Sequence, residues 1–262
     1  MEGTVAAILG NADAFVLIAF RTSGLIFSSP VFGRRNIPAI AKIALIGALS
    51  YLFFTILPPG ELIEYNTFLG FVFTVLMELL LGVALAYITN IFFSVTFIAG
   101  HMIDMQLGFG IVNVYDPQNN TQIPMLGNLM NIILLIVFFA VNGHTRLIEI
   151  LFLTFRSMPV GAITFSPQIG YAALEIFARC FTLGIMVAMP IIASGIVLEI
   201  CFGLLMRTVP QLNMFVVGIP LKILVGFLML MFTLPVFVGF SDRLFSEMFA
   251  AIERMFSTFA GG

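Results

Sequence analysis

Seven charged residues lie in the interior of the long apolar stretches of this 262-residue chain. They are Arg21, Lys42, Glu78, Glu175, Arg179, Glu199 and Lys222. One charge near the centre of a membrane helix costs roughly 2.5–3.5 kcal/mol on insertion scales, so seven of them indicate that several helix faces never meet lipid. Such residues form either a proton or ion relay, or ion pairs inside a protein assembly. A relay needs a continuous line of carboxylates or histidines, and because both histidines lie outside the stretches, we favour ion pairs.

The spacing around Glu199 and Lys222 predicts that these two residues pair across a helical hairpin. Each of them has a glycine four residues away on either side, namely Gly195 and Gly203, and Gly218 and Gly226. Glu199 comes 11 residues before Pro210, the centre of a polar turn, and Lys222 comes 12 residues after it. The two charges therefore reach the same depth in an antiparallel hairpin. Small residues let helix backbones approach closely, and we expect the glycines of one helix to face those of the other.

Two further pairings follow from spacing. If the first three apolar stretches form successive hairpins, Arg21 and Glu78 lie within about one helical turn of the same depth. Glu175 and Arg179 are four residues apart, so they can satisfy each other on one helix face.

The composition predicts an all-α membrane protein that positions these charges with long helices. The chain is 61% apolar and 9% charged, with a mean hydropathy of +1.14, whereas soluble domains are about half apolar and a quarter charged. A net charge of −2 gives no basic surface for nucleic acid. Six apolar stretches are present, at 12–32, 39–57, 68–99, 125–141, 169–206 and 214–240.

Two of these stretches are longer than a membrane. As straight helices, 68–99 and 169–206 would measure about 48 and 57 Å, against about 30 Å of hydrocarbon. They must tilt, bend or continue inside protein, and Pro190 is expected to kink the second. Residues 145–156 and 241–260 have the apolar periodicity of amphipathic helices. We expect six spans, with Arg34 and Arg35 on the cytoplasmic side.

The segment between the third and fourth stretches, GFGIVNVYDPQNNTQIP at 108–124, is apolar yet contains residues that break helices. Membrane proteins tolerate such a segment only where it is buried in protein or lines a cavity. We expect the surrounding helices to hold it across a passage.

No motif predicts an enzyme, a metal site or a cofactor. Cys180 and Cys201 lie in apolar stretches without metal or disulfide spacing, and no His-Glu-x-x-His arrangement is present. The first residues lack a basic region, so we expect no cleaved signal peptide.

Three motifs resemble the FliR family of flagellar type III secretion proteins, whose relatives in injection systems are the SpaR and YscT proteins. The strongest is RTVPQLNMFVVGIPLKILVG at 207–226. The second is the central GF, DP and P pattern of Gly108, Phe109, Asp116, Pro117 and Pro124. The third comprises Arg21, Pro30, Phe32, Gly33, Pro38 and Lys42. The motifs follow the family's order and extend over most of the chain.

The resemblance implies a component of the export gate in the bacterial inner membrane, at the flagellar basal body. Its implied partners are FliP, FliQ, FlhB, FlhA, membrane lipid and unfolded export substrates. Residues 1–165 would be FliP-like and residues 166–262 a FliQ-like hairpin with an amphipathic C-terminal helix.

The resemblance also implies a pore plug at about 106–123. Its residues here would be Gly108, Phe109, Gly110, Ile111, Val112, Val114, Tyr115, Asp116 and Pro117. A partner-contact turn would comprise Arg207, Pro210, Gln211 and Asn213, whose polar side chains could also serve as helix caps.

Two other functions stay open. A subunit of a virulence type III injection system would have similar helices and motifs. A small-molecule or ion transporter would also use broken, charged helices, although no repeated pair of broken helices is found in matching halves of the sequence.

Overall fold

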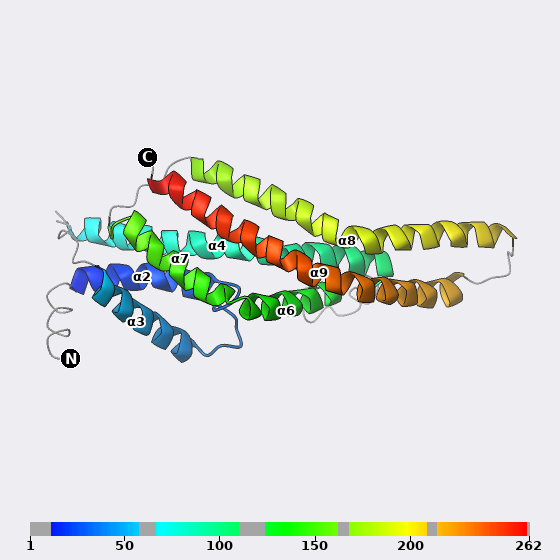
Figure 1. Ribbon diagram of the computed structural model, residues 1–262, viewed down its shortest axis with the longest axis horizontal. Helices are drawn as coiled ribbons and strands as arrows, with labels where there is room; N and C mark the ends of the chain where they lie inside the picture. The colour runs from blue at the N-terminus through cyan, green and yellow to red at the C-terminus, as the bar shows by residue number, and fades with distance from the viewer. Residues whose placement is uncertain (1–11, 58–66, 110–123, 162–167, 209–213, 261–262) are drawn as a thin grey trace. The chain divides into compact units, whose positions relative to one another are not determined.

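The computed structural model describes residues 12–57, 67–109, 124–161, 168–208 and 214–260, and these residues form helices, turns and no strand. An all-α membrane protein is therefore confirmed. Figure 1 shows the helices, which are α2 (Ala12–Ser28), α3 (Ala39–Ile56), α4 (Phe68–Leu107), α6 (Met125–Ala140), α7 (Gly143–Ser157), α8 (Gln168–Thr208) and α9 (Met214–Ala260).

The chain divides into two compact units, and α4, α8 and α9 each contribute residues to both. The first comprises Met1–Ile91, Asn142–Ile176 and Ser246–Gly262, and the second comprises Phe92–Val141 and Phe177–Phe245. The division at residue 165, which rests on resemblance to two other proteins, stays a prediction.

Aromatic side chains contact one another in each unit. In the first, Phe53 of α3 contacts Phe152 and Phe155 of α7, with ring centroids 5.6 and 5.5 Å apart. In the second, Phe138 of α6 lies between Phe93 of α4, at 5.6 Å, and Phe245 of α9, at 5.2 Å. Such contacts add to the free energy of burying the rings.

Three helices are longer than their apolar stretches predicted. α4 continues through Leu107, so Gln106 and Leu107 belong to its last turn and not to the plug loop. Arg207 likewise lies in the last turn of α8. α9 runs without a break from Met214 to Ala260, which joins the last apolar stretch to the predicted tail helix. Pro235 and Gly239 lie close to the junction of the two apolar patterns at 240–241, and neither ends the helix. A single proline or glycine within a long helix can bend or weaken it without stopping it.

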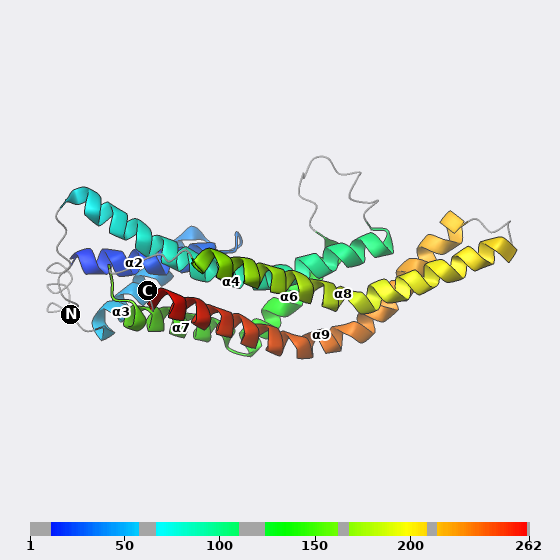
Figure 2. The same cartoon turned by 90° about the horizontal axis from the view of Figure 1, so that it is seen from above.

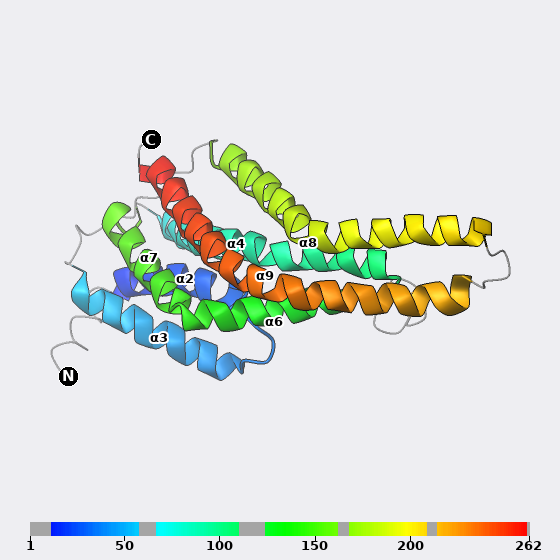
Figure 3. The ribbon, with the colours of Figure 1, turned by 45° about the vertical axis from the view of Figure 1, so that its right-hand side comes forward.

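Prolines bend these helices without ending them. α8 contains Pro190 in its middle, and Figure 3 shows that α8 changes direction along its length, as a proline inside a helix predicts. A proline removes one backbone hydrogen bond and pushes against the preceding turn, so the helix changes direction and then continues.

Fewer of the described helices than the expected six are long and apolar enough to span a membrane. Among the described residues, α3, α4, α8 and α9 are long and apolar enough to cross a membrane, with a fifth crossing if α6 and α7 together form one broken span. α2 has 17 residues and α6 has 16, which makes each too short to span about 30 Å alone.

Candidate functional site

A buried ion pair joins α2 to α4 in the first unit. The Arg21 Nε atom lies 2.6 Å from Glu78 Oε2, and neither side chain is exposed to solvent. The two helix backbones touch beside the pair, because a Cβ atom added to Gly82 would lie 2.1 Å from the Arg21 carbonyl oxygen. Glycine at this position lets α2 and α4 approach closely enough for the charges to meet.

Other groups of the first unit surround both charges. The Arg21 guanidinium donates to Thr154 Oγ1 at 3.2 Å and to the Met158 carbonyl at 3.3 Å, and it lies 4.3 Å from the centre of the Phe155 ring. Glu78 Oε1 accepts the Gly161 amide at 2.7 Å. Other protein groups bind both charged side chains. The pair is therefore a structural contact that holds α2 and α4 together, and it leaves no free group for a proton or ion relay.

The second ion pair lies between α8 and α9 in the second unit. Lys222 Nζ lies 2.5 Å from Glu199 Oε1, with 21% of the lysine and 51% of the glutamate side chain exposed. Figure 2 shows α9 returning beside α8 in this hairpin. The structure thus brings together both residue pairs that spacing had matched in depth.

The glycines around this second pair have a different role from the predicted one. Gly195 and Gly226 do not face each other. A Cβ on Gly195 would lie 2.5 Å from Gln106 Nε2, and one on Gly226 would lie 2.0 Å from Leu107 Cδ2. Nothing lies within 4 Å of a Cβ on Gly203. The prediction of glycine-to-glycine packing was therefore wrong, because the last turn of α4 occupies the space that Gly195 and Gly226 leave.

Two further contacts join the α8–α9 hairpin to the end of α4. Gln106 Nε2 donates to Glu199 Oε1 at 3.3 Å, so Glu199 binds both Lys222 and α4. The Phe109 ring, just beyond α4, contacts the Phe227 ring at 6.3 Å between centroids. These contacts fix the point where the central segment begins.

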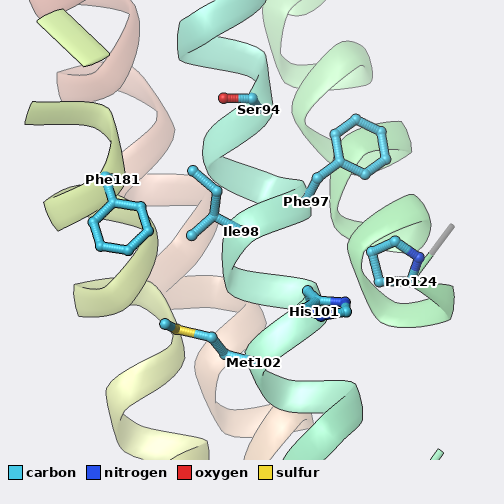
Figure 4. A pocket seen from close by; sticks show the side chains of 7 residues that line it. All are labelled: Ser94, Phe97, Ile98, His101, Met102, Pro124 and Phe181. Atoms are coloured by element: carbon cyan, nitrogen blue, oxygen red, sulfur yellow. The ribbon is translucent and has the colours of Figure 1, made fainter. Parts of the chain in front are cut away.

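A shallow groove lies along α4 between Ser94 and Met102. It encloses about 410 Å³ and is lined by Ser94, Phe97, Ile98, His101, Met102, Pro124 and Phe181. In Figure 4, Phe97 and His101 of α4 lie towards Pro124, while Ile98 and Met102 lie towards Phe181 of α8. Its lining suits apolar packing, and the described residues include no cluster of metal ligands.

Sequence comparison assigns this architecture to a family. A family model described as “Bacterial export proteins, family 1” matches residues 12–248. The chain belongs to this family. The match includes the seven helices of the described residues except the last part of α9.

Individual relatives agree with this assignment. The chain is 34% identical over 248 residues to flagellar biosynthetic protein FliR of Bacillus subtilis (strain 168), covering 92% of this chain and 93% of that protein. It is 29% identical over 237 residues to FliR of Escherichia coli (strain K12), covering 90% of each. It is also 26% identical over 157 residues to Yop proteins translocation protein T of Yersinia pestis, covering 58% and 59%. These names describe export and flagellar biosynthesis rather than catalysis.

Only part of the predicted plug and contact turn of this export protein falls within the described residues. Gly108 and Phe109 are described, with Gly108 at φ +83°. The remaining plug residues, Gly110, Ile111, Val112, Val114, Tyr115, Asp116 and Pro117, lie outside them, as do Pro210, Gln211 and Asn213 of the turn.

The sequence analysis did not predict several of the polar contacts. Thr154, Met158 and Gly161 complete the Arg21–Glu78 cluster from more than 80 residues away in the chain. Lys42 donates to the Gly33 carbonyl at 2.9 Å, which accounts for one intramembrane charge without an acidic partner. Asp104 was also missed, although an aspartate four residues before a glycine at a helix end was a detectable signal.

Proposed function

We propose that this membrane-embedded export protein is a component of the flagellar type III protein export gate in the bacterial inner membrane. With FliP and FliQ it forms the pore through which unfolded export substrates enter, next to FlhB and FlhA. The family match over 12–248 and the FliR relatives support this proposal.

One structural observation argues most strongly for a subunit of a larger assembly. With 41 and 47 residues, α8 and α9 are about 62 and 70 Å long, twice the hydrocarbon thickness. Large apolar side chains are exposed along α8 from Tyr171 to Met206 and along α9 from Val216 to Val238. The exposed stretch of α9, at about 35 Å, fits one bilayer, whereas that of α8, at about 54 Å, is too long for one, and this supports neighbouring protein helices as its cover.

The central segment is the proposed plug. Its apolar residues, Phe109, Ile111, Val112, Val114 and Tyr115, fill the pore when no substrate is present, and an apolar constriction also excludes ions. The glycines and the Asp116-Pro117 step give the segment its turns. The contacts of Gln106, Leu107 and Phe109 with α8 and α9 support this role, because a plug needs a fixed point of attachment.

The proposed contacts of the C-terminal part follow from the same family. Residues 1–165 pack as the FliP-like part and 166–262 as the FliQ-like part of the assembly. The turn formed by Arg207, Pro210, Gln211 and Asn213 contacts a neighbouring export protein such as FlhB.

Two measurements test the proposal. The chain is co-expressed with FliP-like and FliQ-like proteins from the same operon, extracted in mild detergent and weighed by native mass spectrometry. A defined complex that contains this chain is expected. A chain that purifies alone and well folded would instead favour the transporter.

The plug is tested inside that complex by measuring ion leakage across the membrane. Replacing four apolar residues with serine keeps the segment's length and is expected to make cells leak ions (Ile111, Val112, Val114 and Tyr115). The matched control replaces three polar residues of the same segment with serine and is expected to stay tight (Gln118, Asn119 and Asn120). Equal leakage from both variants would contradict the plug.

A second candidate is a subunit of a virulence type III injection system. The match to the Yersinia pestis translocation protein favours it, although that match covers 58% of this chain, against 92% for the FliR protein of Bacillus subtilis. Restoration of swimming in a FliR-deficient bacterium would distinguish the flagellar component from the injection-system subunit.

A further inference from the structure

Asp104 lies where α4 ends, and its backbone helps to stop the helix. The Phe109 amide donates to the Asp104 carbonyl at 2.9 Å, and the Gly108 amide donates to the Met105 carbonyl at 3.2 Å. With Gly108 at φ +83°, this is a Schellman motif, in which a left-handed glycine lets two amides satisfy the last carbonyls of a helix.

The side chain of Asp104 acts on a different helix. α6 begins after Pro124, whose side chain makes no capping hydrogen bond, and a helix leaves its first four amides without partners. The Leu126 amide donates to Asp104 Oδ1 at 3.3 Å. Asp104 therefore caps α6 from 22 residues earlier in the chain, which is a role that a residue directly before the helix usually fills.

Close contact between α4 and α6 makes this capping possible. A Cβ on Gly100 would lie 2.0 Å from the Gly127 Cα atom, so the two backbones touch one turn before Asp104. Asp104 and Leu126 are 3% and 1% exposed. In such a dry site the negative carboxylate and the positive end of the α6 dipole attract each other strongly.

The second carboxylate oxygen distinguishes this residue from an ordinary cap. Asp104 Oδ2 is buried and accepts no hydrogen bond within the described part of the chain. Burying an oxygen without a hydrogen bond is costly. The hydrogen bonds that Asp104 Oδ1 and the Asp104 carbonyl accept must therefore hold the carboxylate in this position.

We propose that Asp104 is the positioning residue of the connection between α4 and α6, because its carbonyl ends one helix and its carboxylate begins the other. A single residue thereby fixes both ends of the connection. The effect of this positioning on gating rests on the proposed export function, whereas the positioning itself does not.

Hydrogen–deuterium exchange of the purified complex tests the positioning. Asp104→Ala removes the cap, and exchange in the first turn of α6 is expected to rise about fivefold to thirtyfold, as for the loss of a helix cap. Asp104→Asn keeps an oxygen acceptor but loses the charge, so a smaller rise of about twofold to fivefold is expected. Asp242→Ala, which removes an exposed carboxylate from α9, is the matched control and should leave α6 unchanged.

Each outcome has a separate meaning. Unchanged exchange in α6 in both Asp104 variants would overturn the proposal. If the alanine variant does not assemble, the asparagine variant decides alone, since its side chain has the same shape. Faster exchange without ion leakage would keep Asp104 as the positioning residue and would count against the plug.

Discussion

The two intramembrane ion pairs of this chain look alike in sequence and differ in their surroundings. Arg21 and Glu78 are fully buried, and groups of their own unit satisfy both. Glu199 is half exposed and lies among exposed apolar side chains such as Ile200 and Leu224. The first pair is complete within the chain. The second lies on a surface that lipid would not cover favourably, which fits a site covered by a neighbouring subunit.

The largest expected effect comes from breaking the buried pair. Glu78→Ala would leave the Arg21 cation buried without its counterion, which costs about 3–5 kcal/mol, a large fraction of the roughly 5–15 kcal/mol that stabilises a typical domain. We expect little intact complex in the membrane and a lower midpoint of thermal unfolding in detergent.

A double variant sharpens this prediction. Arg21→Met together with Glu78→Leu removes both charges and retains apolar volume, so stability should recover in part. A double variant as unstable as Glu78→Ala would indicate that the charges do more than clamp the helices.

The next effect concerns the glycines beside each pair. Gly82→Ala forces α2 away from α4 and is expected to lower the free energy of unfolding by about 1–3 kcal/mol. Gly203→Ala meets open space near the second pair and should raise helix stability by up to about 1 kcal/mol. Denaturant titration of the complex compares the free energies of unfolding of the two variants. Equal losses of stability in the two variants would mean that a neighbouring subunit occupies the space at Gly203.

The smallest expected effect comes from the exposed pair. Lys222→Met should change the free energy of unfolding of the detergent-solubilised chain by no more than about 1 kcal/mol, since water reaches this pair where no subunit covers it and such exposed ion pairs contribute little. Exchanging the charges, by Glu199→Lys with Lys222→Glu, should restore what either single reversal loses. If Lys222→Met prevents co-purification of partners while the folded chain persists, the pair belongs to an interface.

Sequence reasoning matched the residues of both pairs because helical rise and turn position fix depth along a hairpin. It failed for Gly195 and Gly226, which receive Gln106 and Leu107 of α4. Depth says which residues lie at the same level, but it leaves open which of several helices approaches a given face. It also ended the third apolar stretch at residue 99, because Gly100, His101 and Asp104 interrupt the apolar pattern, whereas α4 continues through them to Leu107.

The sequence by itself determined the all-α membrane class, the family and the depths at which charges meet. These depend on composition, motif order and helical periodicity, which are properties of the chain alone. Only the tertiary structure decided which charges are enclosed and which are open. Thr154, Met158 and Gly161 reach Arg21 and Glu78 from a distant part of the chain, and Asp104 caps a helix to which it does not belong. Burial and capping are set by what packs against a residue, and no local pattern in the sequence specifies that neighbour.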